Sequence, residues 1–222
     1  MTEPGGLLGY RMAKALLANP LHHAYDIEVD GLERVPAGGV ILAANHRSFM
    51  DSIFLALVMN RPVSFLAKAE YFDRRTTAWF FRSTGQIPLR RGSPAGARRA
   101  LETAGDLLRG GGVVGVYPEG TRSRDGLLHR GHLGPARLAL ASGAPIVPVG
   151  LVGTDRVQSP DQRLPRLRKR VEARFGEPLR LDPQEANLRD FTDRMMADIG
   201  ELCGQEHTDR YAQLVARVPE LD

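Results

Sequence analysis

The sequence predicts an α/β fold, a single domain with a mixed central sheet flanked by helices. Short apolar segments of strand length alternate along the chain with amphipathic segments of helical length, which is the pattern of α/β proteins. No internal repeat or low-complexity linker interrupts the 222 residues, so we expect one domain over residues 1–222. Within it we expect an N-terminal amphipathic helix (1–24), a core (25–180) and a C-terminal helical segment (181–222).

Each element follows from residue type and periodicity. Runs rich in apolar and β-branched residues, bounded by Gly, Pro or Asn, predict strands at 25–36, 38–45, 62–68, 85–91, 113–118, 145–152 and 171–179. Helical periodicity predicts helices at 6–19, 51–60, 70–83, 93–112, 133–143 and 187–203. The helix over 93–112 has the clearest ends, because Pro94 stands near its start and glycines follow its last turn.

The charge of the chain is unevenly distributed. The formal net charge is +4, but residues 182–222 contain ten acidic residues and four arginines, which leaves about +10 on residues 1–181. An anionic partner is therefore expected at the basic part, which is densest in RLPRLRKR (163–170). Nucleic acid is not the expected partner, because the few aromatic residues are not interleaved with this cluster.

No membrane-spanning segment is expected. The longest clean apolar run, IFLALVM (53–59), is much shorter than the ~20 residues that cross a bilayer. We see no signal peptide, and the single cysteine, Cys203, excludes an internal disulfide, so a cytoplasmic protein is expected. The N-terminal helix carries an apolar stripe that either packs on its own domain or lies in a membrane interface. The stripe consists of Leu8, Met12, Ala15 and Leu16.

A histidine and an aspartate follow the strand predicted over 38–45. They are His46 and Asp51 of the segment NHRSFMD (45–51). Ser48 and Asp51 fit the Ser-x-x-Asp pattern that opens many helices, so in one interpretation Asp51 only caps a helix. In the other, its carboxylate accepts a hydrogen bond from His46, fixes the imidazole tautomer and leaves the second nitrogen free as a general base. The two interpretations are compatible. As a helix cap, Ser48 is not the expected nucleophile.

The segment YPEGTRS (117–123) follows another predicted strand. Its turn brings backbone amides, the Thr121 hydroxyl and Arg122 to one rim, next to Gly120. The planar fork of an arginine suits a phosphate or carboxylate, although a surface loop with a solvated arginine has the same sequence. We expect Glu119 to order Arg122 or the loop of Thr121 rather than to act as a second base.

A third segment, GQIPLRRG (85–92), ends a short strand with two arginines. Arg90 and Arg91 point to opposite faces of a strand, so only one of them faces a common pocket. Arg91, next to Gly92, is the one expected there. Because open α/β sheets form their sites just beyond strand ends, the three segments are expected to meet at the C-terminal ends of the strands.

Several other functions are not supported by the sequence. The remaining histidines lack the spacing of a metal site, and no H-E-x-x-H motif occurs. The sequence also lacks G-x-S-x-G, Walker and G-x-G-x-x-G motifs, which argues against α/β-hydrolases, P-loop proteins and dinucleotide-binding proteins.

Taken in order, the segments resemble the glycerolipid acyltransferase family, whose type member is 1-acylglycerol-3-phosphate acyltransferase. NHRSFMD is similar to the N-H-x4-D motif of the family, GQIPLRRG to its second block, YPEGTRS to its E-G-T-R block and VPVG (147–150) to its fourth, apolar block. The resemblance covers residues 25–180. The second block departs from the family pattern at Arg90, where members often carry an acidic or polar residue.

The resemblance implies transfer of a fatty acyl group from acyl-CoA or acyl carrier protein to the hydroxyl of a lysophospholipid. The first candidate acceptor is 1-acylglycerol-3-phosphate, which would give phosphatidate. His46 would be the general base and Asp51 the residue that orients it. The predicted acceptor site consists of Arg91, Glu119, Gly120, Thr121 and Arg122, with the two arginines on the phosphate.

Two alternatives remain at this point. The acceptor could be another lysolipid or a glycolipid, or the chain could be a non-catalytic module that binds anionic lipids. Either way we expect peripheral attachment to the inner face of the cell membrane, through the N-terminal helix and the basic cluster. That cluster is Arg163, Arg166, Arg168, Lys169 and Arg170. No metal and no cofactor beyond the thioester co-substrate is expected.

Overall fold

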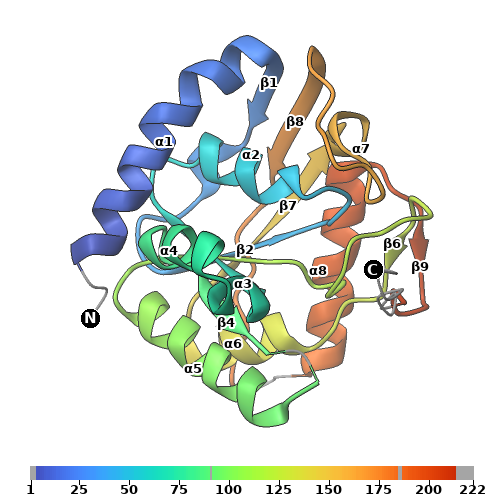
Figure 1. Ribbon diagram of the computed structural model, residues 1–222. Coiled ribbons are helices and arrows are strands. Elements are labelled where there is room, and N and C mark those ends of the chain that lie inside the picture. Colours follow the sequence, from blue (N-terminus) through green and yellow to red (C-terminus); the bar gives the residue numbers. More distant parts are fainter. Residues whose placement is uncertain (1–3, 91, 185–186, 214–222) are drawn as a thin grey trace, which may run out of the picture.

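A computed structural model describes residues 4–90, 92–184 and 187–213 of the chain. At its centre is a seven-stranded sheet with the order β1-β8-β7-β2-β5-β3-β4 (Figure 1). Among the described strands of this sheet, β7 and β8 are the one antiparallel pair, so the predicted mixed sheet is confirmed. The strands are β1 (Tyr25–Asp30), β2 (Val40–Ala44), β3 (Val63–Lys68), β4 (Ile87–Leu89), β5 (Val113–Val116), β7 (Ile146–Val152) and β8 (Lys169–Phe175).

Helices cover both faces of this sheet, as predicted (Figure 1). One face packs against α5, α6 and α8, and the other packs against α2. The helices are α1 (Pro4–Ala24), α2 (Met50–Val58), α3 (Glu70–Asp73), α4 (Arg75–Ser83), α5 (Pro94–Arg109), α6 (Gly134–Ser142), α7 (Thr154–Val157) and α8 (Leu188–Cys203).

The strand β2 shows why the sheet needs both layers. Its side chains alternate between the two apolar cores: Ile41 and Ala43 face the core with α5, while Leu42 and Ala44 face the core with Leu55 of α2. All five residues of β2 are fully buried. A strand with two buried faces reads as a continuous apolar run, which is how VILAA appears in the sequence.

The direction of the strands fixes where a site can form. β2, β3, β4, β5 and β7 are mutually parallel, so their C-terminal ends lie at one edge of the sheet. The segments that follow β2 and β5 therefore meet there, as the sequence predicts.

The structure differs from the predicted elements mainly in short segments. The helix predicted over 70–83 is broken at Arg74, which has extended dihedral angles and separates α3 from α4. The segment 25–36 leaves the sheet after Asp30 and continues as the 3-10 helix Leu32–Arg34. The helix α7 and the strand pair β6 (Leu128–His129) with β9 (His207–Thr208) were not predicted, because two to four residues carry no measurable periodicity.

The two ends of the chain also refine the prediction. Of the C-terminal segment expected over 181–222, α8 is helical, but the chain then reverses at Gly204 and returns as β9. At the other end α1 packs with the side that carries Tyr10, whose hydroxyl donates to the carbonyl of Ala56 at 3.0 Å. The predicted stripe faces away, with Met12 58% and Leu16 72% exposed. The prediction that this stripe packs on its own domain is therefore wrong for Met12, Ala15 and Leu16. The side chain of Leu8 lies outside the described residues.

Candidate active site

His46 and Asp51 form a hydrogen-bonded pair at the end of β2. His46 Nδ1 lies 2.8 Å from Asp51 Oδ2, and the two side chains are 16% and 0% exposed. Because Nδ1 faces a carboxylate, it carries the proton in the neutral ring, and Nε2 is left as the basic nitrogen. Nε2 has no hydrogen-bond partner among the described residues. The predicted pairing of these two residues is thus present in the structure.

The start of α2 holds Asp51 in place. Besides His46, the same oxygen Oδ2 accepts the backbone N–H groups of Arg47 and Ser48, both at 2.8 Å. The Ser48 hydroxyl in turn accepts the N–H of Met50, the first residue of α2, at 3.1 Å. Asp51 and Ser48 therefore both hold backbone N–H groups at the start of the helix, although the N-cap position itself is Phe49, which makes no side-chain cap. The helix-start contacts and the contact with His46 use the same Asp51 oxygen, so the two interpretations of Asp51 are compatible. Ser48 is fully buried, which excludes it as a nucleophile.

Tyr117, the first residue after β5, stacks on the imidazole of His46. The two ring centroids are 3.8 Å apart and the planes are inclined by 11°. The tyrosine hydroxyl shares a hydrogen bond of 2.8 Å with Ser52. Burial, and secondarily the negative charge of Asp51, raise the pKa of Tyr117 well above its usual value, so the phenol stays neutral. Tyr117 therefore limits rotation of the His46 ring without acting as a base. Its position after a strand is the only feature of the sequence that points to it.

The loop after β5 is fastened directly to His46. The backbone N–H of Ser123 donates to the His46 carbonyl at 2.7 Å. Glu119 accepts the N–H of His46 at 2.9 Å with one oxygen and the N–H of His129 at 3.1 Å with the other. Glu119 is 1% exposed, so it orders this loop as expected, but through backbone groups of both histidines and not through Arg122. A direct contact of Glu119 with a substrate is excluded by its burial.

The residues between Glu119 and Ser123 lie at the surface of the site. Gly120 has φ +74°, and a Cβ atom there would lie 3.1 Å from the ring of His132, so this turn requires glycine. Thr121 and Arg122 are partly exposed. Among the described residues, no carboxylate lies within ion-pair distance of the Arg122 guanidinium, which leaves it available to an anionic ligand.

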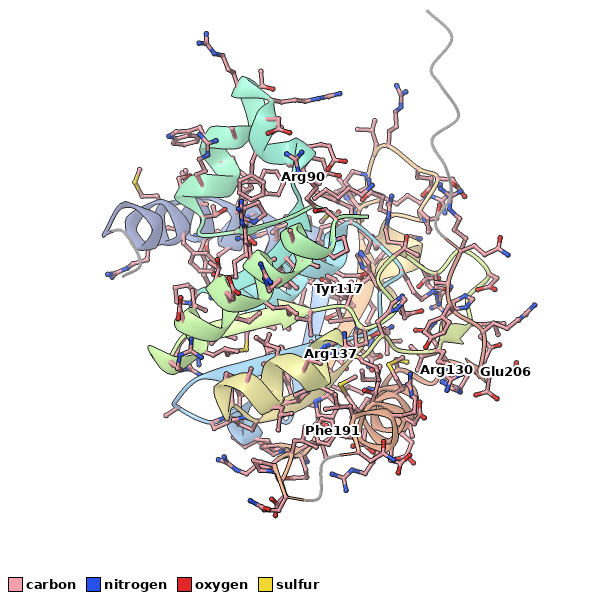
Figure 2. All side chains as sticks on the ribbon, turned by 90° about the horizontal axis from the view of Figure 1, so that it is seen from below. Arg90, Tyr117, Arg130, Arg137, Phe191 and Glu206 are labelled. Atoms are coloured by element: carbon pink, nitrogen blue, oxygen red, sulfur yellow. The ribbon has the colours of Figure 1, made fainter. Side chains whose placement is uncertain are left out.

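The second block is only partly described. Arg91, the arginine expected in the pocket, lies outside the described residues. Arg90 is exposed at the end of β4 and lies apart from Tyr117 (Figure 2). Another arginine was missed by the sequence analysis. Arg47, next to His46, forms an ion pair of 3.1 Å with Asp155 of α7 and so joins the loop of His46 to the segment after β7.

The buried carboxyl of Glu119 gives the site a pH-dependent stability. Burial raises the pKa of Glu119 from 4.5 to about 7, against the opposing effect of its two backbone hydrogen bonds. Between these values the folded protein binds more protons than the unfolded chain, so this contribution to stability is present below pH 4.5 and is lost as the pH rises through 7.

Glu119→Gln is expected to remove this dependence. The free energy of unfolding of the wild type minus that of the variant should fall by about 3 kcal/mol as the pH rises from 4 to 8. Urea denaturation of both proteins at a series of pH values measures this difference. A difference that stays constant over the range would contradict the raised pKa.

Comparisons with known proteins identify the family of the chain. The Acyltransferase family model matches residues 26–152. The chain is 31% identical to the chloroplastic 1-acyl-sn-glycerol-3-phosphate acyltransferase LPAT1 of Arabidopsis thaliana over 66% of this chain and 41% of that protein. It is 30% identical to the 1-acyl-sn-glycerol-3-phosphate acyltransferase of Bacillus subtilis over 57% of this chain and 63% of that protein.

A solved structure has a similar fold. The crystal structure of the 1-acyl-sn-glycerophosphate acyltransferase PlsC from Thermotoga maritima superposes with a TM-score of 0.69 and 28% identity, over 88% of this chain and 79% of that one. LPAT1 and the chloroplastic 1-acyl-sn-glycerol-3-phosphate acyltransferase BAT2 of Brassica napus are longer, and the matched segment of this chain spans less than half of their length. The residues that the family model matches include His46, Asp51 and Glu119. The chain belongs to the Acyltransferase family.

Proposed function

We propose that the protein is an O-acyltransferase that moves a fatty acyl group from a thioester carrier to the hydroxyl of 1-acylglycerol-3-phosphate, giving phosphatidate. The observation that carries the proposal is the 2.8 Å contact between His46 Nδ1 and Asp51, at a strand end to which the loop of Arg122 is fastened. A base and, on the loop bonded to it, a guanidinium without an ion-pair partner among the described residues fit an acceptor with both a hydroxyl and an anionic group. The names of the relatives agree with this acceptor.

The reaction follows from the direction of the His46 ring. Nε2 removes the proton of the acceptor hydroxyl as its oxygen attacks the thioester carbonyl, and Asp51 stabilises the imidazolium that forms. The tetrahedral intermediate collapses, the carbon–sulfur bond breaks, and the thiolate leaves with the proton from the imidazolium. The products are an ester and a free thiol. No cofactor is needed beyond the thioester, because its thiolate is already a good leaving group. In the proposed reaction the acceptor attacks directly, and the buried Ser48 hydroxyl takes no acyl group.

The donor and the acceptor can be identified in one experiment. The purified protein is incubated with a radiolabelled acyl group, supplied either on CoA or on acyl carrier protein, and with a panel of lysophospholipids and glycolipids. The labelled lipid that forms identifies the acceptor, and the donor that yields it identifies the carrier. A module that only binds anionic lipids would bind the acceptors but release no thiol.

Arg122→Ala is expected to weaken binding of the acceptor phosphate. Because a charge-assisted hydrogen bond contributes about 1.5–3 kcal/mol, the KM for 1-acylglycerol-3-phosphate should rise by roughly 10- to 100-fold, with a smaller change in kcat. Steady-state kinetics with the acceptor as the varied substrate measures it. Arg99→Ala on the exposed side of α5 is the control, and an unchanged KM in Arg122→Ala would remove this residue from the phosphate site.

We also propose that the protein works on the inner face of the cell membrane as a peripheral protein. None of the described helices is long and apolar enough to cross a bilayer. The exposed stripe of α1 and the basic loop before β8 suit an interface, since Leu164 and Leu167 are 80% and 63% exposed between the arginines of that loop. Apolar side chains among cations are typical of segments that contact anionic lipid surfaces.

Membrane binding is therefore expected to depend on charge. Sedimentation with anionic vesicles should recover the protein in the pellet at low salt and release much of it at high salt, since each basic residue near the surface contributes about 1 kcal/mol. Neutral vesicles are the control and should retain less protein. A bound fraction that does not change with salt would contradict the role of the basic loop.

A further inference from the structure

The segment after α8 returns to the active-site edge of the sheet. The chain reverses at Gly204 (φ 69°), and β9 then pairs with β6. His129 of β6 lies ten residues after Glu119. This segment, residues 204–211, lies beyond the region 26–152 that the family model matches. Its contacts with the catalytic loops are therefore not assigned by the comparisons.

Gln205 is hydrogen-bonded to two active-site loops at once. Its Oε1 accepts the side-chain amide of Asn45 at 2.6 Å, and its Nε2 donates to the carbonyl of Gly126 at 2.8 Å. Asn45 immediately precedes His46 and is 1% exposed. Its amide also exchanges two hydrogen bonds with the backbone of Leu151 in β7, at 2.7 and 2.9 Å. Gln205, which is itself partly exposed, thus completes a polar network that joins the end of β2, β7 and the loop after Arg122.

A second set of bonds from the same segment holds the other side of the site. The Glu206 carbonyl accepts the N–H of Leu128 at 2.8 Å, and the Arg210 carbonyl accepts the N–H of Arg130 at 3.0 Å. Arg130 and Glu206 accordingly lie together at one side of the molecule (Figure 2). Between these two bonds stands His129, whose N–H donates to Glu119. The segment therefore contacts His46 indirectly in two ways. It is hydrogen-bonded to Asn45, the residue before His46, and through β6 it holds Glu119, which accepts the N–H of His46.

We propose that Gln205 is a positioning residue of the acyltransfer site, and that residues 204–211 act as a strap that holds His46 and the Arg122 loop in register. The proposal rests on the proposed function. Removing the Gln205 side chain leaves the Gly126 carbonyl without this bond and Asn45 with Leu151 as its remaining partner, so the backbone before His46 gains freedom. A small displacement of a base relative to its substrate lowers the rate of the chemical step more than it lowers binding.

Gln205→Ala is expected to lower kcat by roughly 10- to 100-fold while KM for both substrates changes little. Asn187→Ala is the matched control, because it removes the side chain that caps α8, the helix just before Gln205, and so destabilises that helix without contacting either loop. Gln205→Glu retains the acceptor for Asn45 and loses the donor to Gly126, so its kcat should lie between those of the wild type and Gln205→Ala. If Gln205→Ala does not fold, Gln205→Glu tests the proposal in its place.

Amide hydrogen exchange tests the strap without any assay of activity. In Gln205→Ala the amides of His46 and Leu151 should exchange at least about ten times faster relative to those of β5, while in Asn187→Ala this ratio stays at the wild-type value. If both variants lose kcat equally, or if exchange at His46 is unchanged in Gln205→Ala, the proposal is wrong. If the wild type transfers no acyl group, the proposed function fails, and the exchange data still decide whether Gln205 positions His46.

Discussion

His46→Ala is expected to lower kcat for acyl transfer by roughly 10²- to 10⁴-fold, the loss typical of a missing general base. The variant keeps Asp51 bonded to the N–H groups of Arg47 and Ser48, so α2 retains its start. The KM for the acceptor should change little, because binding of its phosphate is assigned to arginine. Steady-state kinetics of phosphatidate formation, with circular dichroism to verify the fold, measures the effect.

His22→Ala is the appropriate control for this substitution. His22 is exposed near the end of α1 and takes no part in the site, so its removal should leave kcat at the wild-type value. A folded His46→Ala protein that forms phosphatidate at nearly the wild-type rate would remove His46 from the role of base.

Asp51→Asn is expected to have a comparable effect with less structural change. The asparagine oxygen can still accept the N–H groups of Arg47 and Ser48 and the Nδ1 proton of His46. What is lost is the negative charge beside an imidazolium that forms during the reaction. The kcat should therefore fall by roughly 10²- to 10⁴-fold. The urea midpoint of unfolding should fall less than in Asp51→Ala, because only the amide that replaces Oδ1 lacks a partner among the described residues.

Asp51→Ala separates the charge of Asp51 from its structural role. It leaves two backbone N–H groups without their acceptor at a fully buried position, and each such group costs about 1–3 kcal/mol. This variant should lose both activity and stability, whereas Asp51→Asn should lose activity with a smaller loss of stability. Equal losses of stability in the two variants, or normal kcat in Asp51→Asn, would contradict the assigned role of the carboxylate.

The sequence predicted the fold and the centre of the site because both rest on local patterns. Continuous apolar runs such as VILAA identify buried strands, and the spacing of His46 and Asp51 is short enough for a helix start to bring them together. The interaction of the Arg122 loop with His46 followed from a general rule about strand ends.

What the sequence did not reveal depends on contacts between distant residues. Gln205 lies 160 residues from Asn45, and β9 consists of two residues, so neither carries a local signal. The side of α1 that faces the domain was also uncertain, because Tyr10 and the stripe with Leu16 are both apolar enough to be buried. Tertiary packing on α2, and not periodicity, decides which side is covered.

The central claim is that His46 acts as the general base for direct attack of a lipid hydroxyl on a thioester, without an acyl-enzyme. The most direct test supplies the wild-type protein with acyl-CoA, or acyl carrier protein loaded with the same chain, and quantifies free thiol and phosphatidate in one reaction. We predict that both products appear in equal amounts, and only when 1-acylglycerol-3-phosphate is present. Thiol released in an amount equal to the enzyme before the acceptor is added, or folded protein that forms no acylated lipid from either donor, would contradict it.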